Sequence, residues 1–179
     1  MGWTIAIIIV AVLVVAVAAV LGLAATKPDA FRVQRTGTFN APPDKIFPHL
    51  NDFHKWAAWS PWEKLDPEMK KTHSGPDRGK GTVYEWEGNK QVGKGRMEIL
   101  EESPPSKMLI KLDFFKPFEA HNTTTFTLDR QGDSTTVKWA MDGKQPFMFK
   151  LMGLFCNMDK MIGKDFEKGL ANLKSIVEA

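Results

Sequence analysis

The chain has 179 residues, 24 basic and 21 acidic side chains, a formal net charge of +3 and a single cysteine, Cys156. This near balance of charge, with the basic residues scattered, argues against a nucleic-acid-binding protein, and one cysteine excludes an intrachain disulfide. The four histidines lack the close spacing of metal ligands, so no metal or other cofactor is expected.

Residues 3–25 form an uncharged, almost wholly apolar run at the N-terminus. As a helix it would span about 35 Å, enough to cross a hydrocarbon core of about 30 Å. A lone segment in lipid must be helical, because its backbone groups have no other partners there. The run therefore predicts a single transmembrane helix. The alternative is a cleaved signal peptide ending at Ala24-Ala25, although the basic region that normally precedes one is missing.

Residues 26–30 form a linker that reaches at most about 17 Å, so the following domain must stay close to the bilayer. Lys27, Arg32 and Arg35, offset by Asp29, flank the apolar run on its C-terminal side only. The positive-inside rule then favours a cytoplasmic position for the domain. We expect a single-pass protein of a bacterial inner membrane.

The first part of the domain alternates between strand and helix signals. Residues 30–40 show the two-residue period of a strand, with Arg35 on its apolar face. Pro42-Pro43-Asp44 opens a helix that Pro48 should kink or shorten. A second short helix is expected at residues 54–59, and a loop with one short strand, residues 69–73, occupies 60–81.

The rest of the domain reads as a run of strands and then one helix. Alternating patterns around Tyr84, Ile99, Ile110, Phe126 and Trp139 are separated by turns of hairpin length, which favours antiparallel pairing. Apolar residues from 148 to 177 recur every three or four positions and predict one helix of that length. The order predicts an α+β domain, in which a curved antiparallel sheet wraps around a long C-terminal helix.

Over residues 31–177 the chain resembles the START-like, or SRPBCC, superfamily of polyketide cyclases/dehydrases and lipid transport proteins, and in particular its membrane-anchored bacterial members. The segments that carry the resemblance are Asn40-Ala41-Pro42-Pro43, Leu50-Asn51-Asp52-Phe53, Trp59-Ser60-Pro61-Trp62, Tyr84-Glu85-Trp86-Glu87-Gly88-Asn89, Gly95-Arg96-Met97-Glu98-Ile99 and residues 159–170. The resemblance implies a helix-grip domain, residues 31–179, with a cavity between sheet and helix for a hydrophobic ligand. It implies no catalytic residue, because the superfamily shares no catalytic motif.

Aromatic and methionine side chains supply candidate residues for such a cavity, since they offer large apolar faces that adapt to varied shapes. The alternative is a filled core. Asp159 falls beside the apolar stripe of the last helix, where it would contact a ligand head-group or form a salt bridge at the rim, and Arg35 has the same two interpretations. The expected lining residues are Trp56, Trp59, Tyr84, Trp86, Phe114, Trp139, Met141, Met152, Phe155, Met158 and Asp159.

Three functions follow from these observations. The first is membrane-tethered binding of a lipid or similar hydrophobic molecule. The second is a cyclase or hydrolase acting on a hydrophobic substrate, which needs an inward-facing acid–base pair, with Asp159 and either Arg35 or His121 as candidates. The third is a protein-interaction module with a packed core and no ligand. The sequence leaves enzymatic activity open.

Overall fold

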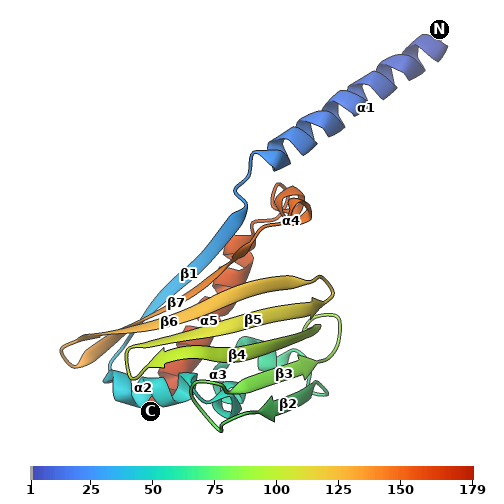
Figure 1. Ribbon diagram of the computed structural model, residues 1–179. Helices are drawn as coiled ribbons and strands as arrows, with labels where there is room; N and C mark the ends of the chain where they lie inside the picture. Colours follow the sequence, from blue (N-terminus) through green and yellow to red (C-terminus); the bar gives the residue numbers. More distant parts are fainter. Residues whose placement is uncertain (1) are drawn as a thin grey trace.

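The computed structural model describes residues 2–179. A long apolar helix, α1 (Gly2–Ala25), projects away from a compact α+β domain (Figure 1). Of the described residues, only this helix is long and apolar enough to cross a membrane. The linker that follows is short, because the first strand already begins at Ala30.

Seven strands form one antiparallel sheet in the order β1-β7-β6-β5-β4-β3-β2. The sheet is curved, and a register shift in β4 next to Ile99 is one point at which it bends. The predicted hairpins are confirmed: each strand after β2 pairs with its predecessor in the chain. The strands are β1 (Ala30–Phe39), β2 (Lys70–Ser74), β3 (Val83–Glu87), β4 (Lys94–Ser103), β5 (Lys107–Lys116), β6 (Ala120–Gln131) and β7 (Ser134–Lys144).

Helix α5 and the short helices between β1 and β2 lie on the concave face of the sheet. The C-terminal helix α5 (Met158–Val177) runs behind the sheet in Figure 1, and packs on β1 and on α3. Short helices between β1 and β2 close one end of this face. They are α2 (Pro43–Leu50), η1 (Phe53–Lys55), α3 (Trp56–Trp59) and η2 (Pro61–Lys64). The expected helix-grip architecture is thus observed.

The single helix expected over residues 148–177 is wrong. The structure has α4 (Phe147–Met152) and, after a break, α5. Gly153 caps the end of α4, and the Asn157 side chain accepts a hydrogen bond of 2.9 Å from the Lys160 backbone N–H at the start of α5. The apolar period runs through the break, but the capping groups decide where each helix stops and starts.

Candidate ligand-binding site

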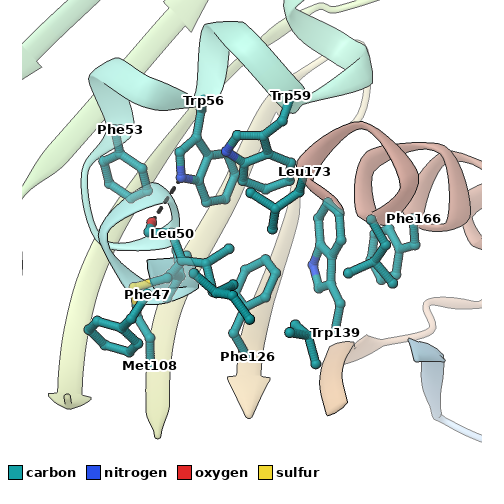
Figure 2. Close-up of a cluster of buried hydrophobic side chains, with 14 of the residues drawn as sticks. Phe47, Leu50, Phe53, Trp56, Trp59, Met108, Phe126, Trp139, Phe166 and Leu173 are labelled. Carbon is teal, nitrogen blue, oxygen red and sulfur yellow. Dashed lines mark hydrogen bonds between the residues drawn. The ribbon is translucent and has the colours of Figure 1, made fainter. Parts of the chain in front are cut away.

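An aromatic cluster joins the sheet to α5 (Figure 2). The Trp139 indole of β7 stacks on the Phe166 ring of α5, with ring centroids 4.1 Å apart and planes 7° apart. Trp59 meets Trp139 edge to face at 5.5 Å, and Phe126 lies 4.9 Å from Trp139. Sheet and helix are therefore in direct contact here and leave no room for a ligand.

Hydrogen bonds fix the two tryptophans of α3 in this cluster. Trp56 Nε1 donates to the Leu50 carbonyl at 2.9 Å, the bond drawn in Figure 2, and Trp59 Nε1 donates to the His49 carbonyl at 3.0 Å. Both indoles are buried. Burial with a satisfied N–H is the arrangement of a structural tryptophan. Trp56 and Trp59 have this arrangement, and Trp139 is buried in the same core cluster.

The half of the concave face nearest the start of α5 is less completely covered. Leu112 and Phe114 of β5 and Ile162 of α5 are apolar side chains that pack on the core but are only half-buried. Leu112 pairs across the sheet with Asn122, and Asn122 pairs with Gly143. We call Leu112, Phe114 and Ile162, together with the buried Asn122, the half-covered strip.

Two buried polar atoms at this face have no hydrogen-bond partner. They are the side-chain oxygen Oδ1 of Asn122 and the indole Nε1 of Trp139, on side chains that are 6% and 2% exposed. An unsatisfied buried polar group costs about 1–3 kcal/mol, so such groups are uncommon in folded proteins. In this structure Asn122 Oδ1 is thus an unused acceptor and Trp139 Nε1 an unused donor.

Tyr84 and Trp86 of β3 are buried, and each side chain donates a hydrogen bond that fixes its position. The Tyr84 hydroxyl donates to Glu63 Oε1 at 2.7 Å, and burial, together with this carboxylate, raises the pKa of Tyr84. Trp86 Nε1 donates to the Val92 carbonyl at 2.9 Å, and the Trp86 ring meets Phe114 edge to face at 5.8 Å. Of the predicted lining residues, Phe114 belongs to the half-covered strip and Trp86 contacts it. Met141 of β7 pairs with Thr124, two residues from Asn122 on β6.

Arg35 and Asp159 form a salt bridge at the rim. Arg35 stays on the helix-facing side of β1 without any bulge, and its guanidinium contacts Asp159 at 3.1 Å and Glu167 at 2.7 Å. The hydrogen bond from Arg35 lowers the pKa of Asp159, whose side chain is 57% exposed. These charges tie β1 to α5 and do not point into an interior space.

His121 lies on the opposite, convex side of the sheet. Its Nδ1 is 2.7 Å from Asp113 Oδ1, and its Nε2 is 3.2 Å from Glu119 Oε1. The hydrogen bond to Asp113 raises the pKa of His121. His121 and Asp159 thus sit on different faces, so this candidate acid–base pair is not assembled in this structure. The alternative pair, Asp159 with Arg35, is in contact but forms the exposed salt bridge at the rim.

Met152 and Phe155 lie outside the interior, on the surface of the segment that contains α4. Their expected place in the lining followed from the single long helix, and the break at Gly153–Asn157 removes it. Phe155 and Met158 border an open pocket of about 470 Å³ at the α4–α5 junction. The other residues around this pocket are Lys27, Gln145, Lys150, Gly153, Leu154, Cys156 and Asn157.

Sequence reasoning missed Leu112, Asn122, Ile162 and Trp62 as residues of this face. The alternation in β5 and β6 carried the signal, because Leu112 falls between Ile110 and Phe114, and Asn122 shares a face with Phe126. Within residues 2–179, no three His, Cys, Asp or Glu side chains come together as metal ligands would.

The domain matches the family model described as polyketide cyclase / dehydrase and lipid transport over residues 30–178. The chain belongs to this family. The match spans the whole sheet and α5 and leaves out only α1 and most of the linker. A comparison of the sequence with curated proteins found no match.

Solved structures share the fold at low sequence identity. Protein CV1439 from Chromobacterium violaceum is 17% identical, with a TM-score of 0.59, over 86% of this chain and 99% of that one. The di-domain ARO/CYC BexL from the BE-7585A biosynthetic pathway is 14% identical, with a TM-score of 0.60, over 89% of this chain and 53% of that one. DynU16, from the dynemicin biosynthetic locus, is 15% identical, with a TM-score of 0.54, over 86% of this chain and 48% of that one.

Proposed function

We propose that this chain is a single-pass membrane protein whose domain binds a lipid or another hydrophobic small molecule between the sheet and α5. The observation that carries the proposal is the half-covered strip, a partly open apolar surface on the concave face of a domain of the polyketide cyclase/dehydrase and lipid transport family. Binding of a hydrophobic molecule would remove Leu112, Phe114 and Ile162 from water.

The polar atoms at this face suggest the chemistry of the ligand. A hydroxyl or N–H group on the ligand would donate to Asn122 Oδ1, and a carbonyl or ether oxygen would accept from Trp139 Nε1. A largely apolar molecule with a few oxygen atoms meets both requirements. Entry would require the aromatic cluster around Trp139 to shift, because sheet and helix touch there.

The apolar helix α1 supports a membrane location, and the short linker would hold the domain against the bilayer. A hydrophobic ligand partitions into lipid, so a binding domain at the surface could take it from the membrane directly. The basic flank formed by Lys27, Arg32 and Arg35 favours the cytoplasmic side.

The test is native mass spectrometry of the domain, residues 27–179, purified without detergent from the organism that encodes it. We expect a defined additional mass that extracts into organic solvent. Leu112→Trp, which fills the half-covered strip, should remove this mass. Leu109→Trp is the matched control, because Leu109 lies on the same strand but on the opposite face, and it should keep the mass.

Two results would count against this function. Equal ligand loss in both tryptophan variants would mean that the strip is not the site. A bare protein mass, with no binding after lipids and quinones are added, would favour an interaction module with a packed core, for which the Trp139–Phe166 stack is the specific evidence.

A further inference from the structure

The polarity of α4 is inverted relative to a helix on a water-exposed surface. Its charged residue, Lys150, is 7% exposed, whereas Phe147, Met148 and Met152 point to solvent. A surface helix normally buries its apolar side chains and exposes its charged ones. α4 therefore presents an apolar face to its surroundings.

Apolar side chains from two neighbouring segments extend this face. Phe155, in the turn after α4, is 76% exposed, and Phe118, in the loop between β5 and β6, is 57% exposed. Phe118 is adjacent to α4, because its ring meets that of Phe149 edge to face at 6.1 Å. Exposed apolar clusters of this kind mark interaction sites. We call Phe118, Phe147, Met148, Met152 and Phe155 the apolar rim.

The apolar rim lies at the C-terminal end of α1. α1 and α4 contact each other, and the end of α1 lies next to α4 in Figure 1. Ala24, in the last turn of α1, is fully buried. The linker is also fixed to the α4 segment: the Gln145 N–H donates to the Asp29 carbonyl at 2.7 Å, and Lys150 Nζ pairs with the Asp29 carboxylate. The rim is thus held where a membrane-spanning α1 would leave the hydrocarbon.

Polar and basic groups lie directly beside the rim. Lys27, Gln145, Lys150 and Asn157 line the open pocket of about 470 Å³, with Phe155 at its edge. Apolar side chains next to basic and amide groups match the two layers of a bilayer surface, where acyl chains lie beneath charged headgroups.

We propose that the apolar rim inserts into the interfacial layer of the same bilayer that α1 spans, and so docks the α4 end of the domain against the lipid. This inference rests on the proposed membrane anchor. The partner is lipid and not a second protein, because the rim is tied to the end of α1 and its aromatic and methionine side chains suit the boundary between headgroups and acyl chains.

The single cysteine allows a direct test in the full-length protein. Cys156 is exposed and follows Phe155, so a nitroxide attached to it reports on the rim. In proteoliposomes we expect the Cys156 label to be accessible to oxygen, which dissolves in lipid, and inaccessible to a water-soluble nickel chelate. This result corresponds to a label about 5–10 Å below the bilayer surface. The reference variant is Asp133→Cys in a Cys156→Ser background, and position 133 lies in the β6–β7 turn. There we expect a label that is accessible to the nickel chelate and less accessible to oxygen.

Substitutions in the rim supply the matched comparison. Phe147→Asp with Phe155→Asp should return the Cys156 label to water, and Phe147→Leu with Phe155→Leu should keep it in lipid. Both pairs alter exposed side chains, so neither should unfold the domain. Retained shielding in the aspartate pair would overturn the docking proposal.

The remaining outcomes separate docking from anchoring. In one outcome the chain floats with the liposomes, but its Cys156 label is as accessible to the nickel chelate as the label at position 133. This outcome refutes docking and leaves the anchor intact. Shielding that vanishes when the lipid-to-protein ratio is raised means that a second copy covers the rim, which also refutes docking. A chain that does not float refutes the anchor and, with it, the docking.

Discussion

At the scale of single residues, Trp139 decides how the interior is used. Its ring contacts Phe166, Trp59 and Phe126, and it is almost fully buried, yet its Nε1 has no partner. Gly169 of α5 permits this approach, because a Cβ at that position would come within 2.8 Å of the indole. One side chain therefore supplies the contact between sheet and helix and also an unused donor.

Substitution of Trp139 tests these two properties separately. Trp139→Ala should lower the free energy of unfolding by about 3–5 kcal/mol, because a large buried ring is lost and a cavity remains. Trp139→Phe keeps a stacked ring and removes no hydrogen bond, so it should cost less than the alanine variant. Urea unfolding of the domain measures both. A cost for phenylalanine equal to that for alanine would show that the indole N–H has a partner in solution.

At the scale of elements, the break between α4 and α5 shapes the end of the domain near α1. It leaves Met152 and Phe155 exposed, and α5 begins with its own cap at Asn157. One continuous helix would have directed Met152 and Phe155 along the concave face. The break instead creates both the apolar rim and the pocket beside it.

The cap at Asn157 can be tested by a pair of substitutions. Asn157→Ala removes the side-chain acceptor for the Lys160 N–H and should destabilise the domain by about 1 kcal/mol. Asn157→Asp keeps an acceptor and places a negative charge at the positive end of the helix dipole, so it should have little effect or stabilise slightly. Chemical unfolding compares the two, and equal losses would show that the amide has a different role.

At the scale of the whole molecule, α1 and the domain share a small interface. Ala24 is the one described residue of α1 that is buried. The domain's hydrophobic core lies between the sheet and the helices of the concave face, and includes no side chain of α1.

Deletion of residues 2–25 should therefore change the membrane location of the protein without changing the stability of the domain. We expect the full-length chain to resist extraction from membranes by alkaline carbonate and the shortened chain to appear in the soluble fraction. The urea midpoint of the domain should change little, because only about one methyl group of burial is lost. N-terminal sequencing of the natural protein can contradict the membrane anchor. A mature chain that starts after Ala25 would identify α1 as a cleaved signal peptide.

The sequence alone determined the class of fold and its local parts. Alternation fixed which side of β5 and β6 faces the helix, and hairpin-length turns fixed antiparallel pairing, because both depend on neighbours along the chain. The apolar run of α1 was equally evident. Asp159 and Arg35 are charged residues beside apolar stripes, a pattern for which a salt bridge at the rim is one interpretation, and the structure has that bridge.

Only the tertiary structure decided how the aromatic side chains are used. Periodicity places Trp139 and Phe166 on faces that meet. Whether these rings enclose a space or stack depends on the distance between α5 and the sheet. Glycines at 163 and 169 allow α5 to lie close to the sheet. The tertiary structure also decided that Asn122 and Trp139 keep unpaired polar atoms and that the break at Gly153–Asn157 points Phe155 outward. These outcomes depend on packing between segments far apart in the chain, which no local pattern records.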